Sequence, residues 1–180
     1  MPYHHFFNKR RRERAFYENG SLLLEKLIAF CNAKPIPIRT FSAQQLFQAT
    51  NNFSSEKLVK GFSIRYKGSL EGRIVLIKRF DYALPGLSTN DLVISAQMSG
   101  HNNVLKPIGC CLHTPSPIAV FEFAANGFLA DRIYVSRRHQ PMVWERRLKI
   151  ARQVAHALSY LHTAFPRPVI HLCISCAISY

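Results

Sequence analysis

The stretch from Leu58 to Phe80 restricts the fold of this chain more than any other feature of the sequence. Apolar and polar residues alternate along it, which is typical of strands that place one face against a core. Turn-forming pairs that end at Gly61 and Gly72 divide the stretch into three strands, of which the clearest begins at Arg73. An antiparallel sheet is therefore predicted, and further strands at 104–111 and 118–123 complete it.

Helical spacing marks several other segments. The strongest pattern begins at Trp144, where apolar residues recur every three or four positions as far as Leu161, and Pro166 and Pro168 then end it. A short apolar strand that opens at Val169 is predicted to follow. Shorter helices are predicted over 43–50, 91–100 and 129–135.

The N-terminal part of the chain has a different character. Residues 1–14 are polar and basic, with the cations gathered between Lys9 and Arg14, and they are predicted to form a solvated tail or a basic surface patch. Apolar residues with helical spacing follow from Leu22 to Phe30, in a segment too short and too charged to cross a bilayer. Prolines at 35 and 37 then indicate an extended linker.

The charge balance favours acidic partners. The 180 residues include 24 Lys and Arg against 10 Asp and Glu, and the net charge of +14 suits an anionic membrane surface, an acidic protein or nucleic acid. Nucleic acid ranks last, because aromatic and basic residues are not interleaved. We therefore predict a cytoplasmic protein, with a peripheral contact at the plasma membrane left open.

The cysteines agree with a reducing compartment. There are 5 of them, an odd number with irregular spacing, which argues against a disulfide framework. Cys173 and Cys176 form one Cys-x-x-Cys pair, but the second pair that a zinc site needs is missing, so no metal site is predicted.

Several short motifs resemble those of a plant receptor-like cytoplasmic kinase. Tyr66-Lys67-Gly68 with Val75-Leu76-Ile77-Lys78 is similar to the second and third strands of that family, and Phe121-Glu122-Phe123 is similar to its hinge. The segment from His101 to Leu105 is similar to the one after the regulatory helix, and Trp144–Ala151 to the long helix of the large lobe. Residues 95–105 are most similar to the ZRK-type pseudokinases, which are related to wall-associated kinases.

This resemblance implies an α+β, protein-kinase-like fold. It places a basic N-terminal segment with an amphipathic helix and a Pro linker at 1–39. A complete small lobe, made of an antiparallel sheet plus one helix, is expected at 40–122. Residues 123–180 are expected to hold the hinge and a truncated helical large lobe that ends at the catalytic loop.

The same resemblance implies that the catalytic machinery is incomplete. A kinase catalytic loop reads His-Arg-Asp-x-Lys-x-x-Asn, in which Asp accepts the substrate proton and Asn holds a magnesium ion. Aligned from His171, the Asp position holds Cys173 and the magnesium-ligand position holds Ile178. No catalytic residue and no metal ligand is therefore expected, and the chain is predicted not to be an enzyme.

The ATP site implied by the resemblance is degenerate too. The adenine roof, which needs small apolar side chains, holds Arg65 and Leu76, and Lys78 with Asp91 stands where a strand lysine and a helix glutamate pair in the family. ATP binding is expected to be weak at most, and no other cofactor is expected. The residues assigned to this site are Lys78, Asp91, Gly61, Arg65, Leu76 and Glu122.

The function implied by the resemblance is that of an adaptor or binding module in plant immune signalling. Its expected partners are a nucleotide-binding leucine-rich-repeat receptor, other receptor-like cytoplasmic kinases, or both. Two alternatives remain open: a residual ATP-binding serine/threonine-kinase-like protein, and a non-functional truncated product. The surface expected to bind partners is the small lobe with the N-terminal segment, and the residues proposed for it are Phe16, Tyr17, Leu24, Ile28, Phe41 and Phe62.

Overall fold

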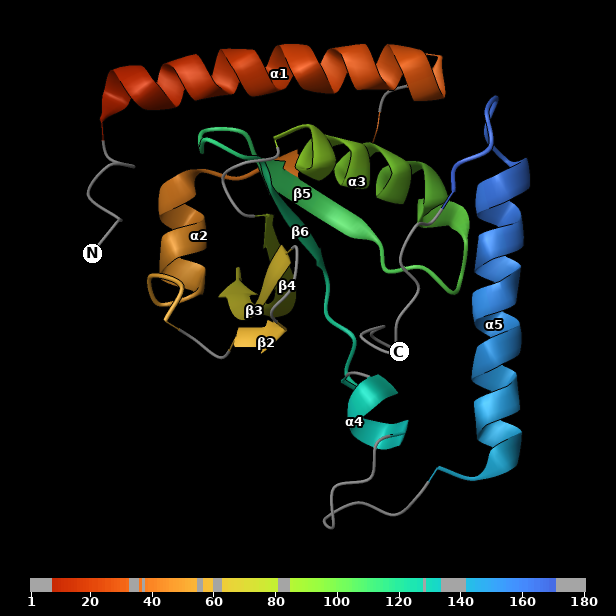
Figure 1. Cartoon of the computed structure of the whole chain (residues 1–180). Helices are drawn as coiled ribbons and strands as arrows, with labels where there is room; N and C mark the ends of the chain where they lie inside the picture. The colour runs from red at the N-terminus through yellow and green to blue at the C-terminus, as the bar shows by residue number, and fades with distance from the viewer. Residues whose placement is uncertain are drawn as a thin grey trace.

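The computed structural model describes residues 8–32, 36, 38–54, 57–59, 63–80, 85–127, 129–133 and 142–170. These residues form a six-stranded sheet in the order β1-β5-β6-β4-β3-β2, with helices on both of its faces (Figure 1). The strands are β1 (Arg39–Thr40), β2 (Lys57–Val59), β3 (Ser63–Leu70), β4 (Arg73–Phe80), β5 (Pro107–Cys111) and β6 (Ile118–Glu122). The helices are α1 (Lys9–Cys31), α2 (Ala43–Ala49), α3 (Pro85–Gln97), the 3-10 turn η2 (Met98–Gly100), α4 (Leu129–Ile133) and α5 (Trp144–Thr163).

The predicted hairpin is confirmed by strands β3 and β4. They pair without a break from Ser63 opposite Phe80 to Leu70 opposite Arg73. Glu71 and Gly72 close the hairpin with φ values of 52° and 76°. Positive φ at both central residues is the geometry whose twist matches paired strands, so the turn fixes the register of the whole hairpin.

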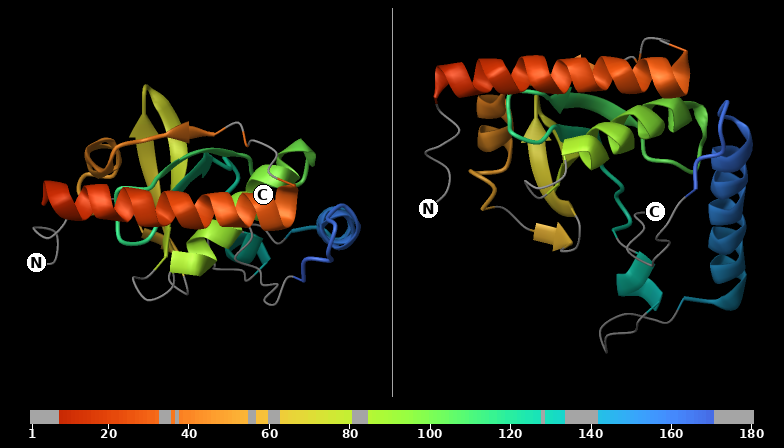
Figure 2. Two further views of the ribbon diagram at one scale, coloured as in Figure 1. Left: turned by 90° about the horizontal axis from the view of Figure 1, so that it is seen from above. Right: turned by 45° about the horizontal axis from the view of Figure 1, so that its top comes forward.

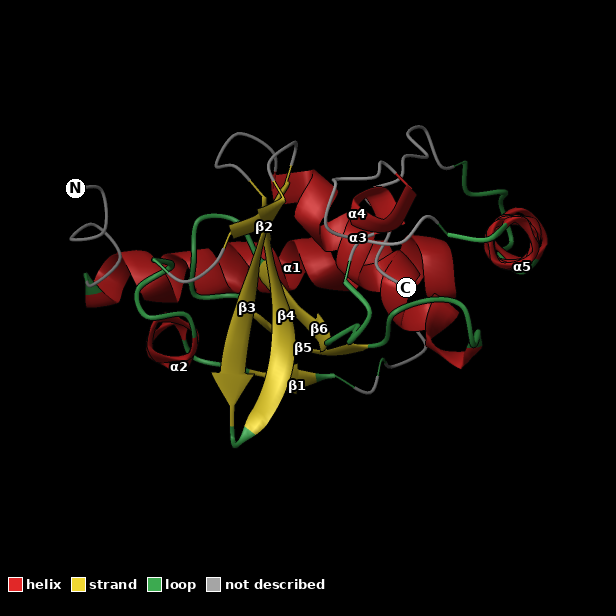
Figure 3. Ribbon diagram, turned by 90° about the horizontal axis from the view of Figure 1, so that it is seen from below, coloured by secondary structure: helices red, strands yellow, loops and turns green. Residues whose placement is uncertain are grey.

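Neighbouring side chains on a strand point to opposite faces. Three consecutive residues of the central strand β4, Val75, Leu76 and Ile77, are buried, so both faces of this strand are covered. Val75 and Ile77 pack in one cluster with α2, and Leu76 packs in a second cluster on the side of α3. Gly68 lets α2 approach the first face closely, since a Cβ there would lie 2.8 Å from Ile77 Cδ1 and 3.1 Å from the Ala49 carbonyl oxygen. Figure 3 shows α2 on one side of the strands and α3 on the other.

The sheet differs from the predicted one at its edge. We expected purely antiparallel pairing, but β1 lies parallel to β5, with Arg39 opposite Gly109 and Thr40 opposite Cys110. Gly109 permits this pairing, because a Cβ there would collide with the ring of Phe41 and lie 2.5 Å from the Arg39 carbonyl oxygen. A strand of two residues has no periodicity to detect, and the prediction placed the boundary between the N-terminal segment (1–39) and the small lobe (40–122) inside it.

The N-terminal helix also differs from the prediction. Basic residues expected in a solvated tail belong to α1, a single helix of 23 residues that begins at Lys9, well before the apolar stripe. Asn8 caps its start by accepting a hydrogen bond from the Arg10 amide, and Asn32, with a φ of 49°, ends it. Two views show α1 lying along α3 (Figures 1 and 2), and the two helices are in contact.

Two further helices begin or end at positions other than those predicted. The helix expected over 91–100 begins at Pro85, where a proline suits the first helical turn, and passes into η2 at Met98. The helix predicted over 129–135 is described from Leu129 to Ile133, and its last two predicted positions lie outside the described residues.

The long helix predicted from Trp144 is confirmed by α5. It buries Ile150 and Leu161 but leaves Trp144 and Leu148 exposed. Its contact with the small lobe is through the loop after η2, where Asn103 Nδ2 donates a hydrogen bond to the Gln153 carbonyl oxygen at 3.4 Å. The strand predicted to follow opens at Val169: residues 169 and 170 are described and are not in a strand, and the positions from 171 onward lie outside the described residues.

Candidate functional site

The structure brings Lys78 of β4 and Asp91 of α3 together. Lys78 Nζ donates a hydrogen bond to Asp91 Oδ1 at 2.7 Å, and the side chains are 16% and 26% exposed. The Lys78 ammonium also lies 4.9 Å from the centre of the Phe80 ring, a favourable position for a cation. This ion pair joins the sheet to α3.

Arg65 lies on β3 directly opposite Lys78 in the strand register, so two cations face the same region. Burial lowers the pKa of the Arg65 guanidinium, and the negative charge of Asp91 partly offsets that effect. The Arg65 side chain is half-buried, which accounts for the direction of this pKa change. The Asp91 carboxylate therefore accepts a hydrogen bond from Lys78 and also acts on Arg65 through its charge.

Leu76 belongs to the hydrophobic core rather than to an open cleft. Its side chain is 5% exposed and packs in the cluster that contains Leu92 of α3 and Phe121 of β6. It shares a face of β4 with Lys78, two positions along the strand. The carbon atoms of Leu76 therefore fill space beside the ion pair.

Glu122 lies at the end of β6 and is used in a structural contact. Its carboxylate Oε1 accepts a hydrogen bond from the Lys106 amide at 3.0 Å, and its own amide donates to the Lys106 carbonyl oxygen at 3.0 Å. These two bonds tie the end of β6 to the residue before β5. The three remaining positions named from the sequence, Gly61, Cys173 and Ile178, lie outside the described residues.

The described residues contain no group of three or more His, Cys, Asp or Glu side chains that could hold a metal ion. In the described part of the site, the cations Lys78 and Arg65 lie beside the apolar core that contains Leu76. Such an arrangement can attract an anion, and it holds α3 at a fixed position against the sheet.

Sequence reasoning missed the anchor of α1 on the small lobe. Asn19 is buried, and its Nδ2 donates hydrogen bonds to the carbonyl oxygens of Leu112 at 2.9 Å and Thr114 at 2.8 Å. One helical turn earlier the ring of Phe16 stacks on His113, with centroids 4.7 Å apart. A polar Asn next to an apolar stripe was the available signal, but its acceptors lie more than ninety residues away.

The comparisons with known proteins agree with this architecture. The family model for protein tyrosine and serine/threonine kinases matches residues 60–176, more than half of the chain. With that match, and with a sheet, helix and strand lysine arranged in this way, the chain belongs to the protein kinase family.

Its relatives within that family are ZRK-type proteins of Arabidopsis thaliana. Serine/threonine-protein kinase ZRK1 is 43% identical over 174 residues, which cover 91% of this chain and 50% of that protein. Non-functional pseudokinase ZRK2 is 44% identical over 170 residues, 89% of this chain and 47% of that protein. Non-functional pseudokinase ZED1 is 41% identical over 171 residues, 91% of this chain and 50% of that protein. The chain thus spans about half the length of these curated relatives.

Among the helices that the structure describes, none combines the length and the apolar composition needed to cross a bilayer.

Proposed function

We propose that this chain is a catalytically inactive kinase-like binding module that acts through protein partners. The observation that supports the proposal is that Leu76 packs in the core and that Arg65 is half-buried opposite Lys78, at positions that the family resemblance assigns to the nucleotide. Two of the relatives are named non-functional pseudokinases. Cys173, at the position of the catalytic aspartate, adds a chemical reason, because a thiol is a poor replacement for a carboxylate base.

The cost of these side chains to ATP binding is large enough to matter. Overfilling a packed pocket costs about 1–3 kcal/mol for each added group. A micromolar dissociation constant corresponds to only about 8 kcal/mol, so Arg65 and Leu76 together remove a large share of it. In this proposal the residues of the ATP site have a structural role instead: the Lys78–Asp91 ion pair connects the sheet to α3.

The surface that we propose for the partner is the outer face of α1. Tyr17, Leu24 and Ile28 are 73%, 56% and 56% exposed, and their spacing of seven and four residues places them on one side of the helix. Phe16 and Leu23, by contrast, pack inward on the small lobe. The outer apolar stripe is therefore available for contact while the inner face holds the helix in place.

Of the two other residues expected on this surface, one is buried and one lies outside the described residues. Phe41 is 3% exposed and belongs to the core beside α2, so it is not a surface anchor. Phe62 lies outside the described residues.

The proposed partner class is a nucleotide-binding leucine-rich-repeat immune receptor, other receptor-like cytoplasmic kinases, or both. The test is co-precipitation of such a receptor with the full chain and with the variant Leu24→Ala/Ile28→Ala. We expect the variant to lose capture without a change in melting temperature, because both side chains are exposed. Leu148→Ala on α5, also an exposed leucine, is the matched control. Retained capture by the double variant contradicts the assignment of this face.

A peripheral membrane contact is a second proposal, favoured by the exposed cations at the start of α1. Lys9, Arg10 and Arg11 are exposed and lie in the first turns of the helix. Each basic residue near an anionic surface contributes about 1 kcal/mol, and salt weakens that attraction. We expect sedimentation with phosphatidylserine vesicles at low salt that is lost at high salt and on Arg10→Gln/Arg11→Gln. Binding that ignores both salt and lipid charge refutes the proposal.

A further inference from the structure

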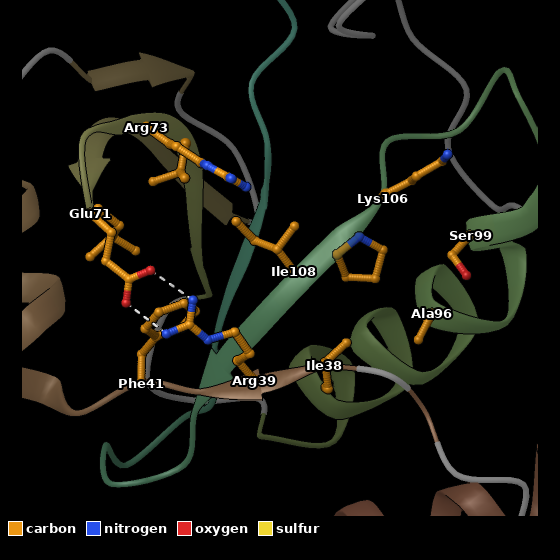
Figure 4. Close-up of a pocket in the computed structure, with 12 residues that line it drawn as sticks. Ile38, Arg39, Phe41, Glu71, Arg73, Ala96, Ser99, Lys106 and Ile108 are labelled. Carbon is orange, nitrogen blue, oxygen red and sulfur yellow. Dashed lines mark hydrogen bonds and ion pairs between the residues drawn. The ribbon is translucent and has the colours of Figure 1, made fainter.

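A second candidate binding site lies away from the Lys78–Asp91 ion pair. It is a pocket of about 450 Å³ between β1, the tip of the β3–β4 hairpin, the start of β5 and the end of α3 (Figure 4). None of the residues assigned to the nucleotide site lines it. A volume of this size is within the range of ligand sites in proteins.

The lining of the pocket is mostly apolar. Ile108 of β5 lies in the middle of the labelled residues in Figure 4, and Ile38 and Ala96 lie below it in that view. Seven of the lining residues are apolar: Ile38, Phe41, Leu70, Val75, Ala96, Pro107 and Ile108. This surface suits the side chain of an aliphatic or aromatic residue.

Charged residues surround this apolar surface. The lining includes three cations and one carboxylate, so the charges sum to +2 (three minus one). Arg39 makes a two-pronged ion pair with Glu71, with its two terminal nitrogens 2.8 and 2.6 Å from the carboxylate oxygens. That pairing holds Arg39 over the Phe41 ring, at 5.2 Å. Arg73 and Lys106 are the other two cations of the lining; both are exposed, and the charge of Arg73 also acts on Glu71.

The position of β1 adds a third feature. It is the terminal strand in the order of the sheet, so in the described part of the chain one edge of its backbone has no neighbouring strand. Extended peptides bind by adding to such an edge and placing alternate side chains in nearby pockets. An exposed edge beside an apolar pocket with a positive rim matches an extended acidic segment.

We propose that this pocket binds an extended acidic peptide segment of a partner protein. One apolar side chain of that segment enters the pocket, and carboxylates on either side of it meet Arg73 and Lys106. The proposal is independent of the function assigned to the outer face of α1, because the two surfaces share no residue.

The test is a fluorescence anisotropy titration of the full chain with a short fluorescein-labelled peptide that has one isoleucine flanked by Asp and Glu. We expect saturable binding that weakens about tenfold in the variant Arg73→Gln/Lys106→Gln, since the exposed cations contribute modestly and together. Arg146→Gln/Lys149→Gln on α5 removes the same charge from another exposed surface and is expected to leave binding unchanged.

Two altered peptides separate the roles of charge and apolar contact. Replacing the isoleucine by serine tests the pocket floor, and replacing every acid by its amide tests the rim, and each is expected to reduce affinity. Equal weakening by the two double variants means that binding follows net charge alone and overturns the proposal. So does the absence of saturable binding at millimolar protein. Leu24→Ala/Ile28→Ala is expected to leave peptide binding intact, so failure of this site and failure of the α1 surface are distinguishable.

Discussion

Replacement of Asn19 by alanine tests whether α1 is an integral part of the small lobe. The Asn19 side chain is 4% exposed and donates two hydrogen bonds to backbone carbonyl oxygens, one of Leu112 and one of Thr114. Each such bond contributes about 0.5–1.5 kcal/mol net, so losing both costs about 1–3 kcal/mol. Alanine returns about 0.5 kcal/mol through its higher helix propensity. The free energy of unfolding is therefore expected to fall by about 0.5–2.5 kcal/mol.

The measurement is urea unfolding followed by circular dichroism, together with the melting temperature. A loss of that size lowers the melting temperature of a protein of this length by about 1–10 °C, at about 2–4 °C per kcal/mol. Asn19→Asp is expected to lose more than Asn19→Ala, because a carboxylate has no hydrogen to donate and would face two carbonyl oxygens. Ser21→Ala on the exposed side of α1 is the control and is expected to change little. A change below about 0.3 kcal/mol for Asn19→Ala refutes the account of the anchor.

Two further predictions concern titratable groups. Burial raises the pKa of the Cys110 thiol to about 12 and that of Cys111 to about 11. At pH 8 the thiolate fraction is then at most about one in a thousand, so mass spectrometry after iodoacetamide treatment is expected to find both unmodified until the chain unfolds. The hydrogen bond from Arg39 lowers the pKa of Glu71. Its stabilising effect is therefore present above the unfolded-state pKa of about 4.3 and disappears as pH falls through the lower folded-state value, and the stability difference between wild type and Glu71→Gln is expected to shrink in that range.

The hairpin could be predicted because its information is local. Residues 63–80 alternate in polarity, and the turn residues at Glu71 and Gly72 indicate where the chain reverses. The long helix from Trp144 was accessible for the same reason, since its period is carried by its own residues. The family motifs then supplied the order in which these elements assemble.

The extent of α1 could not be predicted, because its stability comes from distant contacts. The run from Lys9 to Arg14 is strongly basic, and such a run in isolation is expected to be solvated. In the structure those residues form the exposed start of a helix that Asn19 and Phe16 hold against the loop after β5. No local pattern indicates which carbonyl groups an asparagine will reach.

The candidate site was only partly accessible from sequence. Matching the family motifs placed Lys78 and Asp91 as partners, and the structure brings them together at hydrogen-bond distance. Sequence did not reveal that Leu76 packs fully into the core or that Glu122 bonds to the Lys106 backbone. The pocket beside β1 was also missed, because it depends on a parallel pairing that Gly109 permits.

The most direct test of the central claim is isothermal titration of the full chain with Mg-ATP. The side chains of Arg65 and Leu76 are expected to prevent measurable binding below about 1 mM, and the variant Arg65→Val/Leu76→Ala is expected to bind more tightly than the wild type. A wild-type dissociation constant near or below about 10 μM contradicts the claim that these side chains close the nucleotide site.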